Sequence, residues 1–190
     1  MNTEQIVKEI IEDSKVVMII TKPQVRTKLG YYIVSRLLEI PNTEGLYLAL
    51  NIPHTTVERE LKKRGADPSR VFFIDCITSS IKAVETTEKV IYLDSPNLML
   101  LENVMKHGLK TLGGERNFVY IESISTLLAY NSYQSFIRFL RMITNEIRLY
   151  GLVGILFVLD KELQEVEFSQ VSTFVDDVID LQNVTLEELQ

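Results

Sequence analysis

A basic segment, residues 21–28, contains the side chains best suited to bind an anion. It reads Thr-Lys-Pro-Gln-Val-Arg-Thr-Lys between an apolar run and a helical pattern. A strand, an eight-residue loop and a helix form the layout of a phosphate-binding loop, whose glycines let backbone N–H groups surround phosphate. This segment has no glycine. We leave open an altered anion site at a helix N-terminus and a plain surface loop. The candidate nucleotide-binding residues are Lys22, Gln24, Arg26, Thr27 and Lys28.

A second candidate position follows the apolar run of residues 118–121, where Glu122 and Ser123 stand. An acidic residue that ends an apolar strand is typical of the Walker B arrangement, in which a carboxylate holds magnesium. The alternative is a strand-end carboxylate that caps the next turn. Glu122 and Ser123 are therefore Walker-B-like candidates.

Other polar residues follow the remaining apolar runs. Asn51 cannot accept a proton, although an ATP-hydrolysing site would need a carboxylate there to activate water. His54 is expected to be structural or exposed. Asp75 is expected to cap a turn rather than to bind magnesium, and Cys76 to be a small buried hydrophobe rather than a nucleophile.

The elements that must position these residues alternate along the chain. Near-continuous apolar runs predict strands at residues 16–20, 46–50, 71–74, 90–93, 118–121, 152–159 and 178–181. Helical patterns lie between them, at residues 31–38, 55–64, from Ser95-Pro96 towards Gly113, and from residue 131 or 132 to 150. We expect a loop or short hairpin at residues 161–167. This alternation predicts an α/β fold with a mainly parallel sheet covered on both faces, whose ligands bind at the carboxyl ends of the strands.

The composition limits the classes of protein that the chain can be. It has 190 residues, a net charge of -6, 46% hydrophobic residues and one cysteine. These values exclude a disordered chain and an internal disulfide, and the apolar runs are too short for a membrane span. The acidic balance disfavours general nucleic-acid binding. We expect one cytoplasmic domain over residues 1–190. A row of arginines, Arg138, Arg141 and Arg148, predicts a solvated helix face or a partner contact.

The chain also resembles a known family. Residues 118–159 are similar to the Walker B strand, following helix and next strand of RecA-superfamily ATPases of the KaiC-like archaeal group. The motif-like part is Glu-Ser-Ile-Ser-Thr-Leu at residues 122–127. Residues 45–75 resemble the part of this group that contains Arg-Gly-Ala-Asp and Phe-Phe-Ile-Asp. The resemblance implies a three-layer RecA-like (P-loop NTPase-like) fold.

Three parts of the ATP chemistry depart from this family's pattern. Thr21 and Arg26 stand where the phosphate loop has glycines, Asn51 where a catalytic glutamate is expected, and Glu122 where the Walker B aspartate is expected. Side chains in such a loop would block the close approach of phosphate. These departures predict a degenerate Walker A motif and a pseudo-ATPase without catalytic residues or a metal site.

The leading hypothesis is a catalytically degenerate KaiC/RecA-like domain that acts as a regulatory or scaffold protein, through protein contacts or self-association and without a cofactor. A homo-oligomer is expected by analogy with relatives that assemble into rings or filaments. The alternative is a residual nucleotide-binding protein with weak ATPase activity, for which ATP and magnesium would be the cofactors. A hydrolase using Cys76 or Ser123 is a third hypothesis, which no nucleophile elbow or triad supports.

Overall fold

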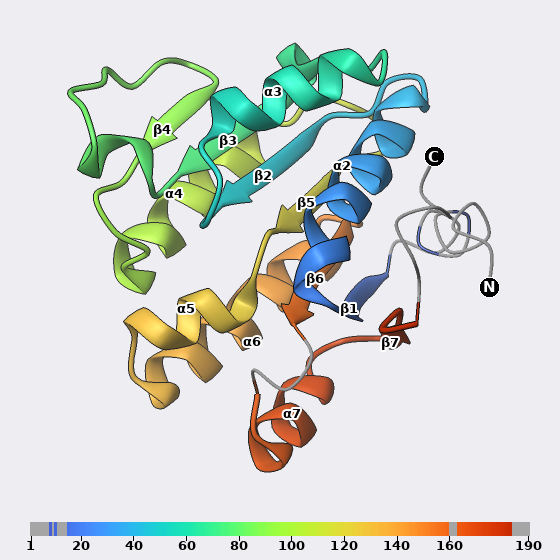
Figure 1. Cartoon of the computed structure of the whole chain (residues 1–190), viewed down its shortest axis with the longest axis vertical. Coiled ribbons are helices and arrows are strands. Elements are labelled where there is room, and N and C mark those ends of the chain that lie inside the picture. The colour runs from blue at the N-terminus through green and yellow to red at the C-terminus, as the bar shows by residue number, and fades with distance from the viewer. Residues whose placement is uncertain (1–7, 9, 11–14, 160–162, 184–190) are drawn as a thin grey trace.

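The computed structural model describes residues 8, 10, 15–159 and 163–183. In this part of the chain the strands form one seven-stranded sheet in the order β4-β3-β2-β5-β6-β1-β7, and all neighbouring strands are parallel (Figure 1). The strands are β1 (Val16–Thr21), β2 (Gly45–Ala49), β3 (Val71–Asp75), β4 (Val90–Tyr92), β5 (Phe118–Ile121), β6 (Val153–Leu159) and β7 (Asp177–Asp180). The predicted parallel sheet is confirmed.

The helices carry the labels of Figure 1. They are α2 (Pro23–Glu39), α3 (His54–Lys63), α4 (Leu98–Thr111), α5 (Ile124–Tyr130), α6 (Tyr133–Leu149) and α7 (Glu165–Ser172), with short 3-10 turns at Pro68–Arg70 and Thr78–Ser80. No helix among the described residues is both long enough and apolar enough to cross a bilayer.

Alternate residues of each strand enter two separate cores. Val17 and Ile19 of β1 pack with α2 and α3 on one face of the sheet. Val16 and Met18 pack on the other face, with α4, α5, α6 and α7. Since side chains alternate across a strand and both faces are covered, the strands must be apolar throughout. The molecule therefore has three layers, as the sequence predicted.

The connection from β1 to α2 differs from the predicted eight-residue loop. β1 ends at Thr21 and α2 begins at Pro23, so only Lys22 lies between them. Proline at the first helical position is preorganised for the helix and lacks an N–H that would need a partner. The carbonyl of Lys22 accepts hydrogen bonds from the N–H groups of Val25 and Arg26, each at 3.1 Å. The predicted loop is therefore the first part of a helix.

The start of α4 is also corrected. Asn97, not Ser95, caps the helix, and its Oδ1 accepts from the N–H groups of Met99 at 3.0 Å and Leu100 at 3.2 Å. Pro96 stays outside the helix, where its carbonyl accepts a hydrogen bond from Asn131 Nδ2 at 2.9 Å. The predicted core face of this helix is confirmed, because four residues are buried: Leu98, Leu101, Met105 and Leu109.

The later helices were only partly predicted. Ser132 caps α6, and Gly151 follows it with a φ of 64°, as expected for a glycine that ends a helix. No helix was predicted at α5. The predicted loop or hairpin at residues 161–167 is corrected where it is described, because Gln164 and Glu167 form a capping box that starts α7. Residues 161 and 162 lie outside the described part of the chain.

Candidate functional site

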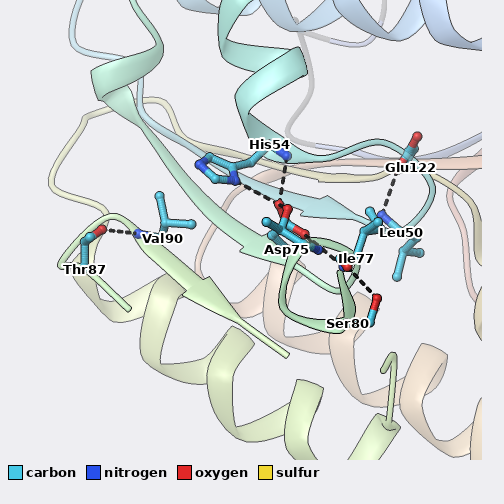
Figure 2. Close-up of polar contacts among 9 residues, drawn as sticks. Leu50, His54, Asp75, Ile77, Ser80, Thr87, Val90 and Glu122 are labelled. Carbon is cyan, nitrogen blue, oxygen red and sulfur yellow. Dashed lines mark hydrogen bonds and ion pairs between the residues drawn. The ribbon is translucent and has the colours of Figure 1, made fainter. Parts of the chain in front are cut away.

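The carboxyl ends of β1, β2 and β5 meet around one buried carboxylate, Glu122. Its Oε2 atom accepts hydrogen bonds from the N–H groups of Leu50 at 2.7 Å and Asn51 at 2.8 Å, directly after β2. Figure 2 shows the bond to Leu50, which links two neighbouring strand ends. Glu122 thus caps the end of β2 through backbone donors.

The second oxygen of Glu122 faces Arg26, which lies in the first turns of α2. The Nη2 atom of Arg26 is 3.9 Å from Oε1 of Glu122, and the two side chains are 13% and 3% exposed. Within the described residues, neither Glu122 Oε1 nor Arg26 Nε has a hydrogen-bond partner. Arg26 lies in the helix that follows β1, and Glu122 directly follows β5. Since β6 lies between these two strands, the ion pair reaches across the carboxyl end of β6.

Burial raises the pKa of Glu122 above its ordinary value, although the N–H groups of Asn51 and Leu50 and the charge of Arg26 act against this rise. A buried carboxylate is stabilised by hydrogen bonds to its charged form. Here these reach one oxygen only. Glu122 is therefore a buried carboxylate with one oxygen that accepts no hydrogen bond among the described residues. It lies at the position predicted for a magnesium ligand.

The other candidates have separate roles. The Oγ atom of Ser123 accepts from the N–H of Thr126 at 3.2 Å and caps α5. The side chain of Asn51 accepts from Thr126 Oγ1 at 3.1 Å. Lys22, Gln24 and Lys28 are exposed, and Thr27 is half-buried. Of the predicted nucleotide-binding side chains, the structure brings only Arg26 against Glu122.

A second buried carboxylate, Asp75, ends β3 and holds the start of α3 (Figure 2). Its Oδ2 accepts from the backbone N–H of His54 at 2.9 Å, from His54 Nδ1 at 2.8 Å and from Thr78 Oγ1 at 2.7 Å. Its Oδ1 accepts from the N–H groups of Ile77 at 2.9 Å and Thr78 at 2.8 Å. Burial opposes ionisation, but these hydrogen bonds hold the pKa of Asp75 well below its usual range.

This arrangement leaves Asp75 little capacity to bind a metal. An ionised carboxylate offers about four lone-pair positions, and Asp75 already accepts from five donors. The expected role of Asp75 in capping a turn agrees with this geometry. His54 must carry a proton on Nδ1, since an ionised carboxylate can only accept. Cys76 is buried, and burial raises the pKa of its thiol to about 12, so it is a poor nucleophile.

Sequence reasoning missed the pairing of Asp75 with His54. The signal was present, because His54 follows β2, Asp75 ends β3, and adjacent parallel strands bring their carboxyl ends together. Among the described residues, no group of three or more histidine, cysteine, aspartate or glutamate side chains could hold a metal ion.

No protein-family model matches the sequence, and no curated protein matches it. The structure is similar to the crystal structure of a KaiC-like protein from the hyperthermophilic archaeon Pyrococcus horikoshii. The similarity covers 92% of this chain and 74% of that chain, with a TM-score of 0.62 and 14% sequence identity. The fold is KaiC-like. At this identity the likeness concerns the fold alone, and it confirms the three-layer RecA-like fold that the sequence resemblance implied.

Within this KaiC-like fold, the predicted Walker A and Walker B positions are the start of α2 and the end of β5. They contribute the two members of the ion pair, Arg26 and Glu122. The arrangement joins three strand ends, because Glu122 also accepts from the residues that follow β2.

Proposed function

We propose that this chain is a KaiC-like domain that does not hydrolyse ATP and acts as a regulatory or scaffold protein, through protein contacts or self-association. The observation that carries the proposal is the connection between β1 and α2, which consists of Lys22 alone. The proposal includes a cytoplasmic homo-oligomer that needs no nucleotide or metal.

A one-residue connection gives the backbone little opportunity to surround a phosphate. A phosphate-binding loop uses several consecutive N–H groups that point towards the anion. Pro23 has no N–H, and the N–H groups of Val25 and Arg26 already donate to the carbonyl of Lys22. The first turn of α2 therefore directs few free donors towards a ligand.

The remaining positions for ATP chemistry support the same proposal. Glu122 accepts two backbone hydrogen bonds on one oxygen and faces Arg26 with the other, so magnesium would have to displace the arginine. Asn51, at the end of β2, cannot activate water as a base. Hydrolysis would require all these groups to be rearranged.

Exposed apolar side chains on the layer of α4 to α7 favour a role in protein contacts. Met99 is 76% exposed and Tyr130 is 67% exposed. Clusters of such side chains on a soluble surface are typical of interaction sites.

Calorimetric titration with magnesium-ATP and with ADP, together with a phosphate-release assay, tests this proposal. We expect no heat of binding up to about 1 mM nucleotide, which corresponds to a binding free energy weaker than about 4 kcal/mol, and no phosphate release. Micromolar binding that is lost in Arg26→Ala and Lys28→Ala would instead establish the alternative, a residual ATP-binding protein. Light scattering after gel filtration measures the expected oligomer.

A further inference from the structure

A groove runs between α4 and α6 on the face of the molecule opposite α2 and α3. It has a volume of about 430 Å³, and both helices contribute to it. Its apolar lining comes from Leu98 and Met99 of α4 and from Phe139 and Met142 of α6, while Glu102 and Arg138 supply charge. In Figure 1, α4, α5 and α6 gather on the same side of the sheet. The groove thus has a mainly apolar lining with a few charged and polar residues.

Apolar side chains continue outwards from the α4 end of this groove. Met99 is 76% exposed and Leu100, beside it, is 52% exposed. Tyr130, at the end of α5, is 67% exposed. Its neighbour Asn131 binds the residues before α4, because its Nδ2 donates to the carbonyl of Pro96 at 2.9 Å. The exposed part of Met99 therefore extends the apolar lining of the groove, and the end of α5 lies close to the start of α4.

Arg138 is the basic residue of α6 that lines the groove, and Arg141 lies near it on the same helix. Arg138 donates to Ser135 Oγ at 3.3 Å and also lines a second hollow, of about 390 Å³, between α6 and α7. Arg141 follows one turn later and is exposed. Among the described residues, neither guanidinium has a carboxylate within ion-pair distance, whereas Glu102 is already paired with Lys106 at 2.8 Å. Arg138 is thus a groove residue whose positive charge has no carboxylate partner among the described residues, on a chain whose net charge is -6.

We propose that the α4–α6 groove binds an acidic amphipathic helix of a partner protein. This inference rests on the proposed function, and it names the surface and the chemistry of the contact. Apolar residues spaced i, i+3/i+4 and i+7 on the partner helix enter the groove, as in other helix-in-groove complexes. Carboxylates beside this stripe pair with Arg138 and Arg141.

The chemistry of the lining fits such a helix. Methionine side chains adapt to varied apolar shapes, and Met99 and Met142 stand on opposite walls of the groove. Arginine forms charge-assisted, often bidentate hydrogen bonds with carboxylates. A nucleic acid fits this surface poorly. Its affinity depends on neutralising many phosphates, whereas two arginines without carboxylate partners among the described residues are available beside an apolar groove on an acidic protein.

Fluorescence anisotropy with three synthetic peptides on the full chain tests the proposal. The first peptide is a helix with a leucine stripe flanked by glutamates. The second has lysines in place of the glutamates, and the third has the composition of the first in shuffled order. We expect the first peptide to bind with a dissociation constant of about 10–100 μM and the other two at least about tenfold more weakly. Equal binding of all three peptides, or no binding of the first, would overturn the proposal.

Variants assign the binding to the groove. The double variant Arg138→Glu/Arg141→Glu and the single variant Met99→Asp should each weaken binding of the first peptide by about tenfold or more. The matched controls are Arg59→Glu, on exposed α3 surface of the other layer, and Val166→Asp, at a residue that is 77% exposed on α7. Both controls should bind like the wild type. All these sites are on the surface, and circular dichroism verifies that the variants fold.

Three further outcomes separate this inference from the proposed function or assign the groove to another occupant. Absence of peptide binding in samples that also release no phosphate from ATP overturns the groove assignment alone. ATP turnover overturns the proposed function, whereas peptide binding that depends on Arg138 would still stand. Self-association of the wild type that Arg138→Glu/Arg141→Glu abolishes, without peptide binding, would assign the groove to a second copy and overturn the partner helix.

Discussion

Asp75 and Glu122 are two buried carboxylates at the same edge of one sheet, and they accept different numbers of hydrogen bonds. Asp75 receives five hydrogen bonds shared between its two oxygens. Glu122 receives two on one oxygen, and its other oxygen faces an arginine without a hydrogen bond. The pKa of Asp75 is lowered, and the pKa of Glu122 is raised.

Both carboxylates are almost completely shielded from solvent, but Glu122 lies deeper among protein atoms, so burial acts more strongly on its pKa. Burial alone raises the pKa of an acid, and hydrogen bonds to the ionised form lower it. The donors of Asp75 come from a helix start and from the 3-10 turn that follows β3, which together surround it. Glu122 caps only the end of a neighbouring strand. The larger number of donors around Asp75 and the deeper burial of Glu122 together lower the pKa of the first carboxylate and raise that of the second.

The largest expected effect follows from Asp75→Asn. An asparagine can replace one accepting oxygen, but its NH₂ group would face the N–H of His54. An unsatisfied buried donor destabilises by about 1–3 kcal/mol, and the lost charge-assisted bonds add to this. We expect a loss of about 3 kcal/mol, measured as a shift of the urea midpoint. A loss below about 1 kcal/mol would contradict the role assigned to the five hydrogen bonds.

The pH dependence of stability sharpens this prediction. Since the folded-state pKa of Asp75 is below its unfolded value, its stabilising contribution is complete above about pH 4 and is lost as the pH falls further. The difference in unfolding free energy between wild type and Asp75→Asn should therefore shrink below about pH 4. A difference that stays constant under acid would show that the asparagine acts through its shape alone.

A smaller effect is expected at Glu122, where two substitutions separate charge from hydrogen bonding. Glu122→Ala removes the acceptor for the N–H groups of Leu50 and Asn51, which should destabilise the fold by about 2 kcal/mol. Glu122→Gln keeps a carbonyl oxygen for these donors and removes the buried charge. We expect it to remain within about 1 kcal/mol of the wild type. Equal losses in both variants, measured by urea unfolding, would contradict this comparison.

The smallest expected effect is that of Arg26→Met, which removes the charge facing Glu122 but retains an apolar stem. The ion pair has a separation of 3.9 Å and no hydrogen bond, so its loss should destabilise the fold by about 1 kcal/mol at pH 7. The effect should diminish as the pH falls through the raised pKa of Glu122, because a protonated carboxyl needs no counter-charge. Lys28→Met, at an exposed position of α2, is the matched control and should have no such pH dependence.

Much of the fold was predictable because continuous apolar runs and helical spacing are local signals. The runs 16–20 and 118–121 lie within β1 and β5, and the apolar face of α6 is buried as predicted. The site was less predictable, because its contacts join residues far apart in sequence. Glu122 meets Leu50 across 72 positions, and Arg26 meets Glu122 through the fold of the whole sheet. The helix start at Pro23 was missed because the prediction followed the layout of a phosphate-binding loop, although proline at a first helical position was a local signal.

The direct passage from β1 into α2 has a consequence for engineering. An attempt to introduce nucleotide binding could start by exchanging a few side chains of residues 21–28 for glycine, lysine and threonine. With a single residue, Lys22, between strand and helix, such exchanges would alter a helix and create no loop. The connection between β1 and α2 is too short to form a phosphate-binding loop. Building such a loop requires residues inserted between Thr21 and Pro23 before any change of side chain.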